Sequence, residues 1–279
     1  MGAEVDIKKL DLLLEKVYRE GGYDFRDYRP GSVIRRLEKR LHAAGTKTYR
    51  EYIQFLDTHP EEYEKFAEWI TIKVSGFFRN SYGFQQVARL VLPDLVSEKR
   101  KRRDQSLRVW STACARGEEP HSIAILIAEF LGHQRQGFNV SIYGTDISRQ
   151  ALKEAKAGIY SPKDVEGLSG AILENYFNQT DEHYEVRADI KQMVHFSYFD
   201  LTSMARPPFM NLDLIFCCNV LIYLQKQLQE RVLDMLYNSL RSQGYLILGE
   251  AETPPNGLHK KLGCLDRKAK IYKKVGINL

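Results

Sequence analysis

The chain has 279 residues, and its 41 Lys and Arg residues against 36 Asp and Glu residues give a formal net charge of +5. Hydrophobic residues make up 43% and charged residues 28%, which are ordinary globular values and exclude a collagen-like or wholly disordered protein. No apolar run approaches the ~18 residues that a membrane span requires, and the N-terminus has no apolar signal core. We therefore expect a cytoplasmic protein without membrane insertion.

Residues 1–75 predict an all-helical N-terminal domain. Apolar residues recur at i, i+3, i+4 and i+7 over residues 10–17 and again over 33–41, and a later amphipathic helix is indicated over 63–70. Glycines follow the first two helices as stop signals. Ser32 is the expected N-cap of the second helix. Nothing in this region pairs a nucleophile with a base.

The positive charge is concentrated in one segment of these helices. Residues 26–50 carry eight basic and two acidic side chains, a net charge of +6. Such a segment favours an acidic partner: nucleic acid, an anionic membrane or a Glu-rich protein surface. The basic side chains that share the second helix are Arg35, Arg36, Lys39 and Arg40. A second basic run, residues 99–103, lies between expected elements, and we predict that it is a solvated loop.

From residue 107 onward, short apolar runs alternate with helical stretches, which predicts a parallel α/β sheet. Ligands bind such sheets beyond the carboxyl ends of their strands. The expected strands are 107–111, 140–144, 194–199, 212–217 and 245–248, and the expected helices are 118–131, 148–157 and 225–241.

The four cysteines form neither a disulfide framework nor a metal site. They have no C-x-x-C pair and no Cys/His cluster with zinc spacing. We expect no metal and four buried, reduced thiols, namely Cys114, Cys217, Cys218 and Cys264.

The segment after the first strand indicates a nucleoside cofactor without phosphate. Ala113, Ala115 and Gly117 are small residues where a Rossmann-like turn brings the backbone close to its ligand, but the pattern is not G-x-G-x-x-G. Glu118 and Glu119 follow at the helix start, where they would repel a pyrophosphate. S-adenosylmethionine (SAM) has a sulfonium, an amino group and ribose hydroxyls but no phosphate, so it fits this acidic turn. Acidic residues in a first helical turn also simply complement the helix dipole.

The second strand ends at Asp146, 29 residues after Gly117. An acidic residue at this place suits a ribose diol. Taken alone, a strand-end Asp is more often a helix N-cap, but together with the preceding turn we favour ribose binding.

Five segments, in order, resemble the CheR-type chemotaxis receptor methyltransferases. Ser75 stands where the family has Thr, His121 where it has Tyr, and Cys218 where it has Arg. The matching segments are Val74–Arg79, Gly117–Ser122, Tyr143–Ile147, Asp213–Leu224 and Leu248–Glu252.

The resemblance implies an α/β, Rossmann-like SAM-dependent methyltransferase domain over residues 76–279, with a small inserted β-subdomain at about 159–195. It also implies that the all-α domain of residues 1–75 recognises chemoreceptors. The activity it implies is protein-glutamate O-methylation of acidic, Glu-rich receptor helices in chemotaxis, which leaves S-adenosylhomocysteine (SAH). A monomer that binds no nucleic acid is our default expectation.

The resemblance also assigns roles to individual residues. Arg79 and Tyr223 would orient the reacting groups. The receptor would be bound by the four basic residues of the second helix. The cofactor-binding residues would be Ser75, Arg79, Ala113, Glu119, Asp146, Asp200, Leu201, Cys218 and Asn219.

The proposed chemistry needs no general base, because a glutamate with a pKa of ~4.3 is already ionised at neutral pH. Catalysis then consists of aligning the two reactants. Two alternatives remain: a SAM methyltransferase for another acceptor, such as nucleic acid, and a SAM-binding signalling adaptor without turnover. No basic, aromatic-rich surface of the kind that stacks bases supports the nucleic-acid alternative.

Overall fold

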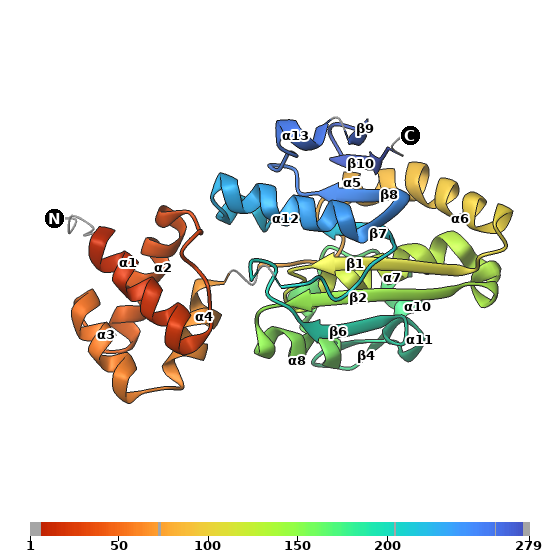
Figure 1. Cartoon of the computed structure of the whole chain (residues 1–279). Coiled ribbons are helices and arrows are strands. Elements are labelled where there is room, and N and C mark those ends of the chain that lie inside the picture. Colours follow the sequence, from red (N-terminus) through yellow and green to blue (C-terminus); the bar gives the residue numbers. More distant parts are fainter. Residues whose placement is uncertain (1–6, 72–73, 204, 260, 276–279) are drawn as a thin grey trace. The chain divides into compact units, whose positions relative to one another are not determined.

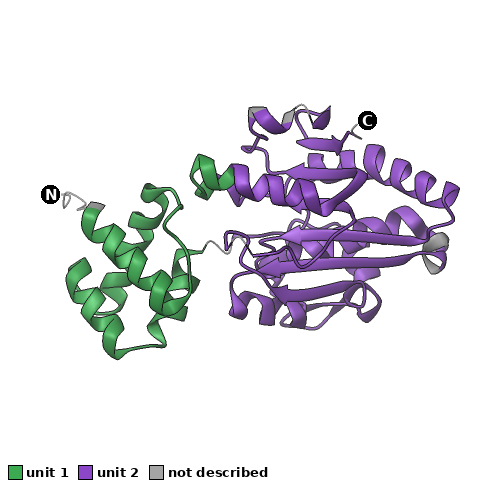
Figure 2. Ribbon diagram, in the orientation of Figure 1, with its two compact units in different colours: residues 1–72, 223–229 green, residues 73–222, 230–279 purple. Residues whose placement is uncertain are grey.

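The computed structural model describes residues 7–71, 74–203, 205–259 and 261–275. The chain forms two compact units (Figure 2). The helical unit comprises residues 1–72 and the distant segment Tyr223–Gln229, and the α/β unit comprises residues 73–222 and 230–279. None of the helices in the described ranges is both long and apolar enough to cross a membrane.

The described N-terminal part of the helical unit, residues 7–71, is built from four α-helices and a π-helical turn. Their apolar faces meet in a core that includes Leu13, Leu37 and Phe66, each fully buried. The predicted all-helical fold is therefore confirmed. The elements are α1 (Ile7–Lys16), η1 (Val17–Gly21), α2 (Pro30–Ala43), α3 (Tyr49–Thr58) and α4 (Glu62–Ile70).

Helix α2 begins earlier than its sequence predicts. Its N-cap is Arg29 and Pro30 lies in the first turn, so Ser32 is inside the helix and the prediction of a Ser32 N-cap is wrong. The physical reason is that proline already has a helical φ and lacks the N–H that a helix start leaves unpaired.

The α/β unit contains a seven-stranded sheet in the order β6-β2-β1-β7-β8-β10-β9 (Figure 1). Neighbouring strands from β6 to β8 are parallel, while β10 runs antiparallel to both β8 and β9. The strand order reverses between β1 and β7, which makes the carboxyl ends of these strands the expected ligand site. The strands are β1 (Ser106–Thr112), β2 (Asn139–Asp146), β6 (Val194–Tyr198), β7 (Leu212–Cys217), β8 (Leu240–Leu248), β9 (Leu262–Asp266) and β10 (Ile271–Lys274).

Helices and a smaller sheet complete this unit. The five predicted strands and three predicted helices are all present, so the α/β, Rossmann-like prediction is confirmed. A three-stranded antiparallel sheet, β3-β5-β4, comprises β3 (Ile159–Tyr160), β4 (Phe177–Gln179) and β5 (Tyr184–Val186). The helices are α5 (Ser81–Gln86), η2 (Val87–Val91), α6 (Leu92–Lys101), α7 (Glu118–Leu131), η3 (Gly132–Gly137), α8 (Arg149–Ala157), α9 (Pro162–Val165), α10 (Gly170–Tyr176), α11 (Ala188–Lys191), η4 (Leu221–Tyr223), α12 (Lys226–Ser239), whose first residues belong to the helical unit, and α13 (Asn256–His259).

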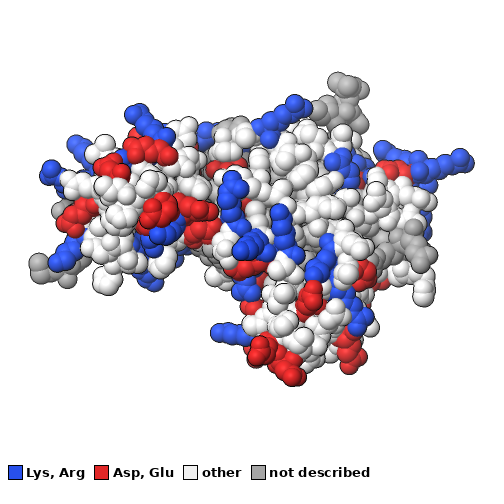
Figure 3. All heavy atoms as spheres, turned by 90° about the horizontal axis from the view of Figure 1, so that it is seen from below, with Lys and Arg blue, Asp and Glu red and all other residues white. Residues whose placement is uncertain are grey.

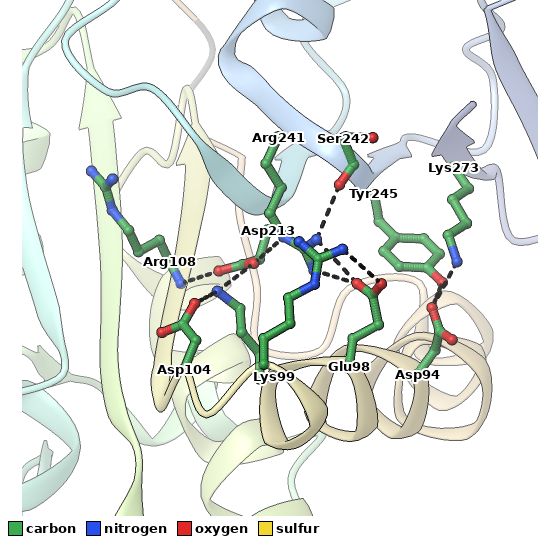
Figure 4. Close-up of polar contacts among 11 residues, drawn as sticks. Asp94, Glu98, Lys99, Asp104, Arg108, Asp213, Arg241, Ser242, Tyr245 and Lys273 are labelled. Carbon is green, nitrogen blue, oxygen red and sulfur yellow. Dashed lines mark hydrogen bonds and ion pairs between the residues drawn. The ribbon is translucent and has the colours of Figure 1, made fainter. Parts of the chain in front are cut away.

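The basic run at residues 99–103 differs from the predicted loop. Helix α6 continues to Lys101, and Lys99 is buried, with Nζ 2.9 Å from Asp213 and 2.7 Å from Asp104 (Figure 4). The prediction is wrong for Lys99 because Asp213 of β7 supplies a buried charge for it to pair with. The other four residues of the run are exposed. Basic side chains project at the right-hand end of Figure 3, where α6 ends.

All four cysteines are free thiols, as expected. Cys114 and Cys217 are buried and Cys218 is half-buried. Cys264 is exposed, so its predicted burial is wrong. Its position on β9 at the edge of the sheet explains the exposure.

Candidate functional site

The turn after β1 is held against the end of β2. The backbone N–H of Cys114 donates to the carbonyl of Thr145 at 2.9 Å, and the N–H of Ala115 donates to Asp146 Oδ2 at 2.8 Å. Ala113 and Ala115 have φ of 51° and 48°. Alanine rarely adopts this left-handed conformation, and such strain concentrates at binding sites. The turn is therefore preformed, with its backbone shaped by contacts from β2.

Glu119 is the acidic side chain that this turn presents. It is half-buried at the start of α7, and its Oε1 accepts a 2.7 Å hydrogen bond from Ser111 Oγ at the end of β1. Burial raises the pKa of Glu119 to about 7, and the charge of Glu252 adds to that rise, whereas Ser111, Cys218 and Arg79 oppose it. Glu119 therefore favours a cationic ligand group, which would stabilise its ionised form.

Glu118 lies deeper than Glu119. It is 2% exposed, and its Oε2 has no hydrogen-bond partner among the described residues. Burial raises its pKa, while Arg116, with Nε 3.9 Å from Oε1, and the Ser75 hydroxyl lower it. Glu118 thus ties Ser75 to the first turn of α7.

The segment Val74–Arg79 is docked on the same helix. The N–H of Phe78 donates to Ser122 Oγ at 2.9 Å, and the Phe77 ring packs edge-on against Tyr160, with ring centroids 4.8 Å apart. Arg79 is exposed, and its Nη1 donates to the Val74 carbonyl at 2.7 Å. The charge of Arg79 lowers the pKa of Glu119. The two phenylalanines thus anchor the segment that carries Arg79.

Asp146 and Asp200 are both buried and both shape loops at strand ends. Asp146 accepts the N–H groups of Ala115 and Ser148, each at 2.8 Å. The N-cap of α8 is Ser148, whose hydroxyl accepts the N–H of Ala151, so Asp146 is not that cap. Asp200 accepts the N–H and hydroxyl of Thr202 at 2.8 and 2.7 Å, next to buried Leu201.

Cys218 and Asn219 follow β7, which lies next to β1 where the strand order reverses. The Cys218 thiol hydrogen-bonds Glu119 and lies 3.9 Å from the carbonyl of Ile247. The replacement of the family's Arg by Cys218 therefore leaves an uncharged group beside Glu119. Asn219 has φ of 62°, and its N–H donates to buried Glu252 at 3.0 Å. The sequence motif contained Glu252, but no pattern signalled that it contacts residues 33 positions away.

The carboxyl ends of β1, β2, β6 and β7 thus carry Ala113, Glu119, Asp146, Asp200, Leu201, Cys218 and Asn219. Ser75 and Arg79 lie outside these strand ends and act on the pKa values of Glu118 and Glu119, respectively. Tyr223 belongs to the helical unit. Its carbonyl accepts the N–H of Arg29 at 2.8 Å, and its ring lies 5.3 Å from the guanidinium of Arg36.

Two of the four basic residues predicted to bind the receptor have partners inside the helical unit. Arg36 Nη1 donates to the carbonyl of Ile70 at 2.6 Å. Arg40 pairs with buried Glu62. Arg35 and Lys39 are exposed on α2, so they are the side chains of this set that α2 offers to a partner.

The site's acidic residues fit SAM. An acidic side chain beside a strained turn suits a sulfonium or ammonium group, whereas a pyrophosphate would be repelled. Together with the open sheet and its switch point, this defines a SAM-dependent methyltransferase. Residues 73–271 match the family model "CheR methyltransferase, SAM binding domain", and residues 8–71 match "CheR methyltransferase, all-alpha domain". The chain therefore belongs to the CheR methyltransferase family, as its motifs predicted.

Curated relatives cover most of the chain. The "Chemotaxis protein methyltransferase" of Borreliella burgdorferi is 31% identical over 88% of this chain and 88% of its own length. Proteins of the same description from Salmonella typhimurium and Klebsiella aerogenes are 30% and 33% identical. They cover 88% and 85% of this chain and 83% and 80% of their own lengths.

Proposed function

We propose that this methyltransferase transfers the methyl group of SAM to glutamate side chains on the cytoplasmic helices of chemoreceptors in chemotaxis. Relatives described as chemotaxis protein methyltransferases, matching over most of the chain, support the acceptor class. The observation that carries the chemistry is the acidic Glu119, held by Ser111 at the strained turn after β1, with the charge of basic Arg79 lowering its pKa. One charge suits the cationic cofactor and the other suits an acceptor carboxylate.

When bound, SAM supplies a methyl group already activated by its sulfonium. Glu119 would hold a cationic or hydroxyl group of the cofactor, with Ser111 fixing the orientation of the carboxylate. Asp146 and Asp200, whose oxygens shape the neighbouring loops, would complete the ribose and adenine sides with Leu201. Ser75, Ala113, Cys218 and Asn219 would line the remaining pocket.

Arg79 would orient the acceptor carboxylate. Arg79 is exposed and held by one backbone carbonyl, so its remaining guanidinium N–H groups can reach a ligand. An ionised glutamate is nucleophilic without a base, so the residues of the site need only align it with the methyl group of the cofactor and exclude water.

Receptor recognition would come from the exposed basic side chains of α2. Arg35 and Lys39 lie one helical turn apart and would attract Glu-rich receptor helices, raising the rate of encounter. The enzyme would act as a monomer in the cytoplasm.

Incubation of the protein with methyl-labelled SAM and membranes containing chemoreceptors tests this function. We expect base-labile label on the receptor band, released as methanol, because carboxyl methyl esters hydrolyse in alkali and N-methyl groups do not. Binding of SAM without transfer would instead favour an adaptor or another acceptor.

Arg79→Ala provides the mechanistic arm of this experiment. We expect it to lower turnover about a hundredfold while the unfolding free energy changes little. Arg89→Ala is the matched control, because Arg89 is another exposed arginine of the same unit. Equal losses of turnover and stability in Arg79→Ala would assign Arg79 a structural role.

A further inference from the structure

One buried carboxylate near the site, Glu252, has no part in the roles given above. It is 3% exposed. Its Oε1 accepts the N–H groups of Leu221 at 2.8 Å and Ile222 at 3.3 Å, and its Oε2 accepts those of Asn219 at 3.0 Å and Gly249 at 2.7 Å. No ion pair joins Glu252 to a cation in the described part of the chain. Peptide dipoles therefore compensate its charge.

Through these contacts Glu252 fixes the backbone conformation of the turn after β7. Asn219 holds a left-handed φ of 62°, a conformation that needs support from its surroundings. Gly249 lets the carboxylate approach, because a Cβ there would lie 2.7 Å from Glu252 Oε2 and 2.8 Å from the Asn219 nitrogen. Without the carboxylate, the N–H groups of this turn would lose their acceptor, which is costly for buried groups.

The charge of Glu252 also reaches the cofactor site. Cys218 directly precedes Asn219, whose N–H lies 3.0 Å from Glu252 Oε2, so the carboxylate reaches the backbone beside this thiol. Burial raises the pKa of Cys218, and both Glu119 and Glu252 raise it further, so both carboxylates act on this thiol. In a partly desolvated site such charges interact more strongly than in water. Methyl transfer removes the cofactor's positive charge, since SAM is a sulfonium and SAH a neutral thioether.

We propose that Glu252 is a positioning residue of the cofactor site, which fixes the turn Asn219–Ile222 and keeps the site negative so that it favours cationic SAM over neutral SAH. The charge acts from behind the turn and needs no contact with the ligand. Its effect would promote exchange of product for fresh cofactor. The role is independent of the acceptor, so it stands whichever carboxylate is methylated.

Calorimetric titration of SAM and SAH into Glu252→Gln at pH 8, above the pKa of about 7 at Glu119, tests the proposal without any acceptor. The amide preserves the size of the side chain, but it removes the charge and turns one acceptor into a donor. We expect SAM affinity to fall about tenfold or more, and the ratio of SAM to SAH affinity to fall about fivefold. Hydrogen exchange should accelerate at the amides of Asn219, Leu221 and Ile222. Glu250→Gln, at an exposed neighbouring position, should change none of these.

Glu252→Asp keeps the test decisive if the Gln variant does not fold. It retains the charge but shortens the reach to the turn, so both affinities should fall while their ratio stays within about twofold of the parent's. Equal weakening of SAM and SAH in folded Glu252→Gln would give Glu252 a purely architectural role and overturn the proposal. So would a shift of the ratio in Glu252→Asp as large as in Glu252→Gln, or unaltered affinities in Glu252→Gln.

Discussion

Arg40 and Glu62 form a bidentate ion pair inside the helical unit, with Nε–Oε1 and Nη2–Oε2 distances of 2.6 and 2.5 Å. The Glu62 side chain is only 2% exposed and also accepts the hydroxyl of Tyr52 at 2.7 Å. The guanidinium joins α2 to α4, so Arg40 serves the fold of this unit. Two other basic residues of the same helix, Arg35 and Lys39, remain exposed.

Arg40→Ala should lower the free energy of unfolding by about 3 kcal/mol, because it leaves the Glu62 carboxylate buried without its cation. Urea denaturation measures this loss. Lys39→Ala, its exposed neighbour, is the control and should change stability by less than about 0.5 kcal/mol. Equal stability of Arg40→Ala and Lys39→Ala would show that the pair contributes nothing.

The same pair gives a pH dependence with a defined sign. Although burial opposes it, hydrogen bonds from Arg40 and Tyr52 lower the pKa of Glu62 below its usual value of 4.5. A carboxyl with a lowered folded-state pKa stabilises the fold above its unfolded pKa, and the contribution is lost as pH falls further. The parent should therefore lose stability below about pH 4.5, and Arg40→Ala should show less of this loss.

Charge reversal at the exposed basic positions should impair receptor use. The double variant Arg35→Glu, Lys39→Glu should raise the KM for receptor about tenfold at low salt, with kcat little changed, because it repels a Glu-rich surface. The difference from the parent should shrink at high ionic strength. An unchanged KM at low salt would exclude these side chains from recognition. The thermal unfolding of the variant serves as its folding control.

Asp213 is the centre of a second buried network (Figure 4). It is fully buried and accepts from Arg108 N–H at 2.9 Å, Lys99 Nζ at 2.9 Å and Arg241 Nε. Asp213→Asn should lower the unfolding free energy by about 3 kcal/mol, because buried Lys99 and half-buried Arg241 lose their shared counter-charge. Asp104→Asn, a more exposed partner of Lys99, should cost about 1 kcal/mol or less. Similar losses in the two variants would contradict a special role for Asp213.

The sheet and its turn could be predicted from sequence because their signals are local. The alternation of apolar strands and helices revealed β1, β2, β6, β7 and β8, and the acids after β1 revealed the cofactor class. The buried contacts of Lys99 and Glu252 could not be predicted, because their partners, Asp213 and Asn219, lie far away in the chain. Strands β3 to β5 have two or three residues each, too few to show the alternation of apolar and polar side chains that predicts a strand. The place of Tyr223 in the helical unit could not be predicted either, because it depends on backbone hydrogen bonds, which side-chain patterns do not indicate.

Gly117 is the turn position where a side chain should be least tolerated. Its φ is +90°, and a Cβ there would lie 2.8 Å from the Cβ of Ala155. Gly117→Ala should therefore cost about 2 kcal/mol of stability and weaken SAM binding by displacing the start of α7. Gly167→Ala, with no atom near its added methyl, is the control and should behave as the parent. Normal SAM affinity in Gly117→Ala would show that the turn tolerates the shift.

SAM binding should weaken as pH falls below 7. Because burial raises the pKa of Glu119 to about 7, the free protein loses its ionised carboxylate over the range in which a cationic ligand requires it. If only ionised Glu119 binds, the dissociation constant should rise about tenfold per pH unit below the pKa, and calorimetry at pH 6, 7 and 8 measures the slope.

Glu119→Gln isolates the contribution of this carboxylate to that slope. It should bind SAM weakly at each pH, and any dependence left in it reports titration of the ligand itself. The unfolding free energy of the parent should change with pH in the opposite direction to its SAM affinity. A carboxyl whose pKa is raised in the folded state destabilises the fold increasingly as pH rises from 4.5 to 7. Glu119→Gln should lack this fall in stability with rising pH. A parent whose affinity is as flat with pH as that of Glu119→Gln would remove Glu119 from the cofactor site.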